Sequence, residues 1–198
     1  MALKIENEKI VGTIDNLEDK LNGEIPVTRE ELLVLVSSWG RRYSFCTKDS
    51  NNEEIYIWKG SESKNPYNLS KLDVSQITNM EDIFSYSGFN SDISNWDTSK
   101  VTDVEFIFNN ALLFNQNISN WNLDKIENCD NMFEEAEAFL DKYNSGKPLP
   151  ADSEDIKKWL IKNRDRMNAI DTKNNYGKEI DGFFSNITNL TKEVKREN

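Results

Sequence analysis

Apolar positions recur along the middle of the chain with a period of 24 to 25 residues. Phe89–Trp96 reads FNSDISNW, and Phe114–Trp121 reads FNQNISNW. Taking the tryptophans as a frame gives three units, the first beginning at Leu72. The apolar slots that the units share are Ile77, Val101 and Ile126; Met80, Val104 and Cys129; Ile83, Ile107 and Met132; Phe84, Phe108 and Phe133; and Phe89, Phe114 and Phe139. A unit of this length cannot bury its apolar face alone, so the pattern predicts units that stack around one continuous core.

Two short elements are expected within each unit. Met80, Ile83 and Phe84 have the i, i+3, i+4 spacing of a single helical turn, and the Ile-Ser-Asn-Trp segment alternates apolar and polar residues as a short strand does. Apolar residues at fixed positions with a period in this range are typical of leucine-rich repeats. We therefore predict an α/β repeat fold, a short leucine-rich-repeat-like solenoid of about three units with an α+β N-terminal cap and a helical C-terminal cap.

The repeat also resembles a known family. WDTSKVTDVEFIF and FNQNISNW are similar to the BspA-like leucine-rich repeats of many bacterial surface lipoproteins, and LDVSQITNMEDIF matches as a first unit. The third unit departs from the pattern after Phe139, because Tyr143 stands in the isoleucine slot and Gly146 in the tryptophan slot. The resemblance covers residues 72–143 and implies a non-catalytic binding scaffold.

The residues before the repeat are predicted to cap one of its ends. Residues 1–71 form this N-terminal cap, ahead of the repeat at residues 72–146. Thr28–Glu31 has the sequence of a capping box and opens an apolar run, which predicts a helix. Arg41–Thr47 and Glu54–Lys59 are predicted to pair as a β-hairpin.

Residues 147–198 are predicted to form a helical C-terminal cap or extension. Asp152 or Ser153 is suited to cap the first helix. The helical stripes are Ile156, Trp159, Leu160 and Met167, and then Ile180, Phe183, Phe184, Ile187, Leu190 and Val194. Two helices carrying these stripes would cover the open end of the repeat, or the final helix would bind a partner or a second copy of the chain.

The side-chain inventory argues against catalysis. The 198 residues include no histidine and only two cysteines, Cys46 and Cys129. Histidine is the commonest general base and the commonest metal ligand, so triads that need it and most zinc sites are excluded. The chain also has no glycine-rich phosphate loop and no nucleophile elbow. We expect a protein that is not an enzyme and that has no cofactor and no metal site.

The negative charge is concentrated in the repeat. Residues 72–140 hold 13 acidic and 2 basic residues, which gives −11, whereas residues 1–71 give −2 and residues 141–198 give +2. Equivalent slots of stacked units lie above one another, so the acidic residues are expected to form ladders. The predicted partner-binding residues are Asp73, Glu81, Asp82, Asp97, Asp103, Glu105, Asp130, Glu134 and Glu135.

Three interpretations of this acidic surface are open. It keeps the protein soluble, it docks on a protein with a basic surface, or its carboxylates bind calcium, although no calcium-loop motif is present. Direct nucleic-acid binding is disfavoured, because the repeat has only Lys100 and Lys125 to contact phosphates. We favour docking, in the form of an intracellular inhibitor or antitoxin-like protein that occupies the basic groove of a nucleic-acid-handling protein.

Two other functions are weighed against this one. The family resemblance suggests a fragment of a bacterial surface adhesin-like protein, and the last apolar stripe suggests a self-associating module. The N-terminal residues MALKIENEKIVGTIDNLEDK lack the apolar run of a signal peptide or membrane span, which predicts a cytoplasmic protein that contacts no membrane, or a cell-surface protein if a leader was removed. The sequence does not predict the oligomeric state.

Overall fold

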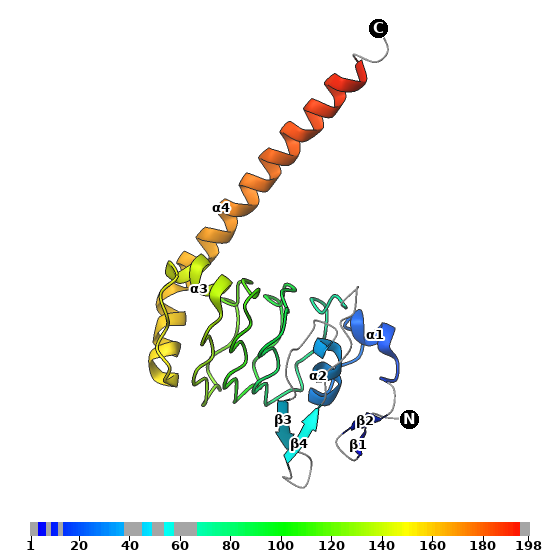
Figure 1. Ribbon diagram of the computed structural model, residues 1–198, viewed down its shortest axis with the longest axis vertical. Coiled ribbons are helices and arrows are strands. Elements are labelled where there is room, and N and C mark those ends of the chain that lie inside the picture. The colour runs from blue at the N-terminus through cyan, green and yellow to red at the C-terminus, as the bar shows by residue number, and fades with distance from the viewer. Residues whose placement is uncertain are drawn as a thin grey trace.

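The computed structural model describes residues 4–6, 9–11, 14–37, 45–48, 54–57 and 67–194 (Figure 1). Two antiparallel strand pairs lie at the N-terminal end of the chain. The elements in chain order are β1 (Lys4–Glu6), β2 (Lys9–Val11), α1 (Leu17–Leu21), α2 (Arg29–Ser37), β3 (Phe45–Lys48), β4 (Glu54–Ile57), α3 (Glu137–Asn144) and α4 (Ser153–Val194). β1 pairs with β2, and β3 pairs with β4.

Residues 67–136 form a stack of similar layers between α2 at one end and α3 at the other (Figure 1). Backbone amides of one layer donate to carbonyl groups one unit further along the chain. The amide of Met80 donates to the carbonyl of Asp103 at 2.8 Å, and that of Val104 donates to the carbonyl of Asn128 at 2.8 Å. Single parallel bridges join Asn79 to Asp103 and Asp103 to Asn128. These partners are 24 and 25 residues apart, as in the unit alignment drawn from the sequence.

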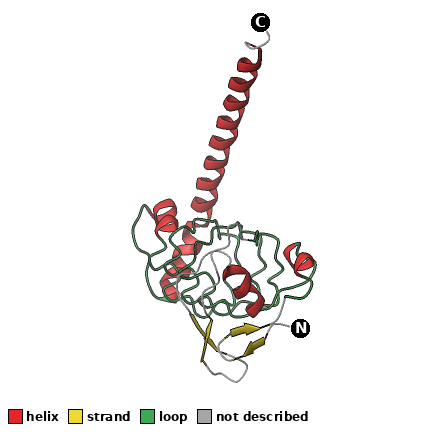
Figure 2. Ribbon diagram, turned by 45° about the vertical axis from the view of Figure 1, so that its right-hand side comes forward, coloured by secondary structure: helices red, strands yellow, loops and turns green. Residues whose placement is uncertain are grey.

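The predicted α/β leucine-rich-repeat solenoid is wrong. Residues 67–136 contain no strand and no helix, only turns, bends and the two bridges (Figure 2). The turn expected to be helical, from Met80 to Phe84, includes Asp82 with φ of 63°, and Tyr86 just after it has φ of 52°. Such left-handed residues interrupt helix and strand alike. The Ile-Ser-Asn-Trp segment turns at Ser94, whose amide donates to the Asp92 carboxylate at 2.9 Å, so it does not run on as a strand.

The repeated aromatic residues form two ladders through the core. Phe108 stacks between Phe84 and Phe133, with ring centroids 5.5 and 5.7 Å apart. Phe114 lies between Phe89 and Phe139 in the same way. All six side chains are buried. Stacked aromatic rings add stabilisation beyond the apolar area that they bury, which accounts for the phenylalanine at these slots in every unit.

The repeated tryptophans connect adjacent layers through their ring nitrogens. Trp96 Nε1 donates to the carbonyl of Leu69 at 3.1 Å, and Trp121 Nε1 donates to the carbonyl of Ile93 at 3.1 Å. Both tryptophans are otherwise buried. Because a buried indole N–H needs an acceptor, each tryptophan fixes the distance between its own layer and the preceding one.

α2 closes the first end of the stack. The predicted capping box forms, since the Glu31 amide donates to Thr28 Oγ1 at 3.2 Å and the Thr28 amide donates to Glu31 Oε2 at 2.9 Å. The helix then buries Leu32, Leu33, Leu35 and Val36. A helix cap of this kind is worth roughly 1 kcal/mol, and the larger contribution comes from burial of the apolar face.

α3 and the first half of α4 close the other end. The two apolar stripes predicted after residue 152 belong to one continuous helix, and Ile156, Leu160 and Met167 of the first stripe are buried. Asn168 Oδ1 accepts hydrogen bonds from Asn117 Nδ2 at 2.9 Å and from Ser119 Oγ at 2.7 Å. Beyond these contacts α4 projects away from the stack (Figures 1 and 2).

Candidate protein-binding face

The structure brings four of the predicted partner-binding residues together at the first two layers. This cluster, named the Glu81 cluster, consists of Glu81, Asp82, Asp103 and Glu105. Burial raises the pKa of the Glu81 carboxyl, and the negative charges of Asp103, Glu105 and Asp82 raise it further. The positive charge of Arg29 acts in the opposite direction and lowers the Glu81 pKa, but burial and the neighbouring acids outweigh it.

Arg29 lies against the Glu81 cluster. Its Nε donates to Asn79 Oδ1 at 3.2 Å, and a terminal nitrogen donates to the carbonyl of Glu81 at 2.9 Å. Burial lowers the pKa of the guanidinium, while the charges of Glu81, Glu30, Asp82 and Asp103 act in the opposite direction. Arg29 comes from α2, about fifty residues earlier in the chain, so part of the negative charge at these layers is compensated within the molecule.

Asp130 continues the slot of Glu81 and Glu105 but has a structural role. Its Oδ1 accepts hydrogen bonds from the Ser153 amide at 2.7 Å and from Ser153 Oγ at 2.5 Å. Ser153 is the first residue of α4. A carboxylate at a helix N-terminus satisfies amides that have no partner within the helix and interacts favourably with the helix dipole.

Asp73 and Asp97 close turns at another corner of each layer. The Ser75 amide donates to Asp73 Oδ1 at 2.9 Å, and the Ser99 amide donates to Asp97 Oδ1 at 3.0 Å. Hydrogen bonds from Ser99 lower the pKa of the Asp97 carboxyl. Asp103 makes the same kind of turn with the Glu105 amide at 3.0 Å. These aspartates fix the backbone with one carboxylate oxygen, and the second oxygen of Asp103 accepts a hydrogen bond from Asn79 Nδ2 at 3.5 Å.

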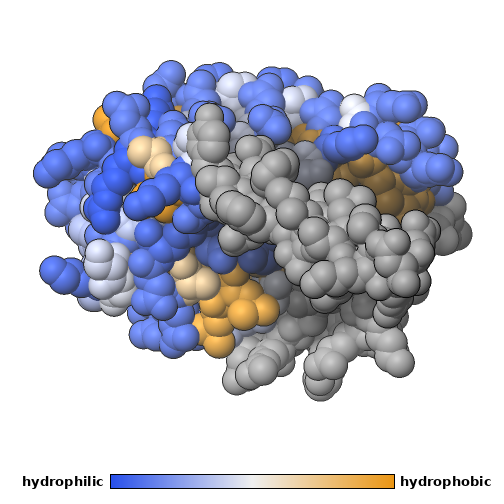
Figure 3. All heavy atoms as spheres, turned by 90° about the horizontal axis from the view of Figure 1, so that it is seen from above, coloured by the Kyte–Doolittle hydropathy of each residue, from blue (hydrophilic) through white to orange (hydrophobic). Residues whose placement is uncertain are grey.

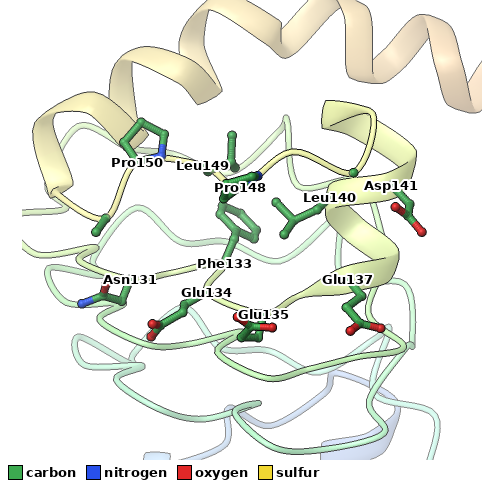
Figure 4. A pocket seen from close by; sticks show the side chains of 12 residues that line it. Asn131, Phe133, Glu134, Glu135, Glu137, Leu140, Asp141, Pro148, Leu149 and Pro150 are labelled. Atoms are coloured by element: carbon green, nitrogen blue, oxygen red, sulfur yellow. The ribbon is translucent and has the colours of Figure 1, made fainter.

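Glu134 and Glu135 lie at the last layer, apart from the Glu81 cluster. Glu134 Oε2 accepts a hydrogen bond from Asn109 Nδ2 at 2.7 Å, whereas Glu135 is exposed. Both residues line a cavity of about 630 Å³ that also includes Glu137 and Asp141 (Figure 4). Arg29, Glu137 and Asp141 are the charged residues that the sequence analysis missed, because nothing in the repeat pattern marks them.

The exposed surface around these sites is mostly hydrophilic. Seen from above, the described atoms form a largely polar surface with separate apolar areas (Figure 3). Among the described side chains, Leu113 and Ile161 are the most exposed large aliphatic residues, at 60% and 61%. Such isolated apolar residues are normal for a protein surface, so charge is the stronger feature of this face.

In the described part of the chain, no group of three or more Asp, Glu or Cys side chains is placed to hold a metal ion. No described helix is both long and apolar enough to cross a membrane.

Residues 55–183 match the family model described as Mycoplasma protein of unknown function, DUF285. The matched range includes the whole repeat stack, α3 and most of α4. Neither a curated protein nor a solved structure matches the chain.

Proposed function

The chain belongs to the DUF285 family of Mycoplasma proteins of unknown function, and on that premise we propose that it is a non-enzymatic protein-binding module. Its partner presents a basic surface to the acidic repeat stack. The observation that carries this proposal is the charge distribution, with 13 acidic and 2 basic residues between residues 72 and 140 against near-neutral flanks.

The geometry of the stack supports this proposal. Layers joined by regular backbone hydrogen bonds hold carboxylates on a rigid surface, so little conformational entropy is lost when they bind. Some of the acids are used internally, at Arg29 and at the start of α4, but Glu127 and Glu135 are exposed. Glu105 is partly exposed, and its Oε2 accepts a hydrogen bond from Asn128 Nδ2 at 2.8 Å. A surface of one sign accelerates encounter with an oppositely charged partner and makes binding sensitive to salt.

The class of target is argued from the same charge pattern. The carboxylates that stay exposed on the stack, such as those of Glu127 and Glu135, present negative charge to a partner, as a nucleic-acid backbone does. A protein with a groove for nucleic acid is therefore a suitable target, and the chain would act as an inhibitor or antitoxin-like protein that occupies the groove.

Charge reversal within the stack tests the proposal. Glu105→Lys combined with Glu127→Lys is expected to reduce capture of the partner from cell lysate at least tenfold, and high salt is expected to reduce capture by the unaltered chain. A nucleic-acid duplex added at low salt should compete with the chain for the captured protein. Glu24→Lys combined with Asp165→Lys is the matched control, because it makes the same change in net charge at exposed positions outside the stack. Equal capture by the two double variants would refute the acidic-face proposal.

The sequence resemblance to BspA-like repeats favours a second candidate function, a binding module displayed on a bacterial surface. Both candidates use the stack as a scaffold, but they place it on different sides of the membrane. Antibody labelling of intact and permeabilised cells separates them, because only a surface protein is labelled in intact cells.

A further inference from the structure

A cavity of about 630 Å³ lies where the last repeat layer meets α3 and the loop at residues 146–151 (Figure 4). Its size is within the range of pockets that bind small molecules or single side chains of a partner. The apolar part of its lining consists of Phe133, Leu140, Pro148, Leu149, Pro150 and Ala151. In the close view, Phe133, Leu140 and Pro148 lie at the centre of the pocket.

Carboxylates line one side and one end of this apolar centre. Glu134, Glu135 and Glu137 follow one side of the pocket, and Asp141 lies at its end (Figure 4). All four side chains are exposed, and none has an ion pair with another described residue. The nearby Lys142 does not line the pocket, since its ammonium group pairs with Asp171 at 2.5 Å and donates to the Asn115 carbonyl at 2.9 Å.

The pocket wall is held by local backbone geometry. Gly146 has φ of 71°, and a Cβ added there would lie 2.9 Å from Asp141 Oδ1. The glycine therefore allows the loop to close beside the carboxylate. On the opposite side, Asn109 fixes Glu134 through its 2.7 Å hydrogen bond. The carboxylates at these two places are therefore positioned at the pocket before any ligand binds.

We propose that this pocket seats an apolar side chain of a partner polypeptide that is flanked in sequence by lysine or arginine. The proposal rests on the function proposed above and names the point at which the basic partner is anchored. Phe133, Leu140 and Leu149 provide apolar contact for the central side chain, and the neighbouring carboxylates pair with the flanking cations. Acidic or phosphorylated ligands are repelled by the same four charges.

The site is tested by nuclear magnetic resonance with the full chain and the acetylated peptide Gly-Lys-Leu-Arg-Gly. We expect the peptide to shift the amide signals of residues 133–151, with weak but saturable binding. A Gly-Glu-Leu-Glu-Gly peptide should cause no shifts. A Gly-Lys-Ser-Arg-Gly peptide should bind at least fivefold more weakly, because it retains the cations but lacks the apolar side chain.

A neutral double variant identifies the carboxylates responsible. Glu137→Gln combined with Asp141→Asn should weaken binding of the peptide at least tenfold. Glu24→Gln combined with Asp165→Asn, an equal charge change at exposed positions outside the pocket and the stack, should leave binding within twofold. The spectra also report whether each variant is folded. Equal binding by both double variants, or no shifts in the pocket, would overturn the inference. Shifts confined to the Glu81 cluster would overturn the pocket proposal and leave the acidic-face proposal standing. If the peptide instead bound in the pocket but charge reversal of the stack did not reduce partner capture, the acidic-face proposal would be refuted and the pocket proposal would stand.

Discussion

Asp130 and Ser153 join the last repeat layer to α4, because one carboxylate oxygen of Asp130 accepts both the amide and the hydroxyl hydrogen bond of Ser153. Ser153 Oγ in turn accepts a hydrogen bond from the Cys129 amide at 2.8 Å. An acidic residue that the charge pattern alone assigns to partner binding therefore fixes the position at which the terminal helix begins.

Asp130→Ala is expected to lower the free energy of unfolding by about 1–2 kcal/mol, because the first residue of α4 loses its acceptor. Asp130→Asn should cost less, since the amide oxygen can still accept one hydrogen bond. Urea unfolding followed by tryptophan fluorescence measures both differences. Asp124→Ala serves as the control at an exposed position, and an equal loss of stability in Asp124→Ala would argue against the capping role of Asp130.

The repeat frame was predictable because apolar residues recur at fixed slots, and the bridges at Asn79, Asp103 and Asn128 confirm its alignment. The backbone conformation was not predictable in the same way. Asp82, Phe106 and Asn131 occupy one slot with φ of 63°, 53° and 52°. Asp and Asn adopt the left-handed region more readily than most residues, but Phe106 in the same slot does not fit that preference, and the shared conformation was not deduced from the sequence. The i, i+3, i+4 spacing of the same segment favoured a helical turn, but the chain instead uses its amides to bond the next layer.

The acidic site was predictable only as a local excess of charge. The repeat pattern predicts that equivalent acids form one ladder, but tertiary contacts give these acids different partners and roles. Arg29, which lies outside the repeat, compensates part of the negative charge of the first layers, and Asp130 accepts a hydrogen bond from the Ser153 amide. The pocket carboxylates Glu137 and Asp141 come from α3, which replaces the expected continuation of the third unit.

Glu81→Gln is expected to stabilise the protein at pH 7 by less than about 1 kcal/mol. Burial and three neighbouring acids raise the folded-state pKa of Glu81, so the folded protein favours the protonated carboxyl. The corresponding stabilisation is complete below the ordinary pKa of about 4.3 and is lost as the pH rises through the raised folded-state value. Glutamine resembles the protonated form at every pH. The stability difference between variant and unaltered chain should therefore disappear at pH 4, as measured by urea unfolding at both pH values.

The matched control is Glu24→Gln, which removes one exposed acid away from the Glu81 cluster and should change stability little at either pH. If Glu81→Gln were instead less stable than the unaltered chain at pH 7, attraction to Arg29 would outweigh burial and repulsion. The conclusion that folding disfavours the ionised form of Glu81 would then be wrong.

Tyr143 should make the fold sensitive to alkaline pH. Its hydroxyl donates to Asp171 Oδ2 at 2.8 Å, and burial, that hydrogen bond and the charge of Asp171 raise the phenol pKa well above its ordinary value. The folded protein therefore keeps a proton that the unfolded chain loses above about pH 10, so stability falls as the pH rises beyond that point. Tyr143→Phe should be less stable at pH 8 by about 1 kcal/mol but should lose less stability between pH 9 and 11. Parallel pH profiles for the two chains would contradict this assignment.

The distal part of α4 is expected to contribute little to the stability of the stack. The described side-chain contacts between α4 and the stack end at Asp171, which bonds Tyr143 and pairs with Lys142, and the helix then projects away from the body (Figure 1). Deleting residues 178–198 should leave the thermal midpoint within about 2 °C, a shift that corresponds to less than 1 kcal/mol in a chain of this size. Asp171→Ala in the full chain is the positive control and should lower the midpoint, because it removes the hydrogen bond to Tyr143 and the ion pair with Lys142 that join α4 to α3. Light scattering on the same samples tests whether the chain self-associates through the apolar stripe from Ile180 to Val194. If it does, the deletion should lower the measured mass by more than the mass of the deleted residues. A large loss of thermal stability on deletion would instead mean that the projecting segment supports the stack.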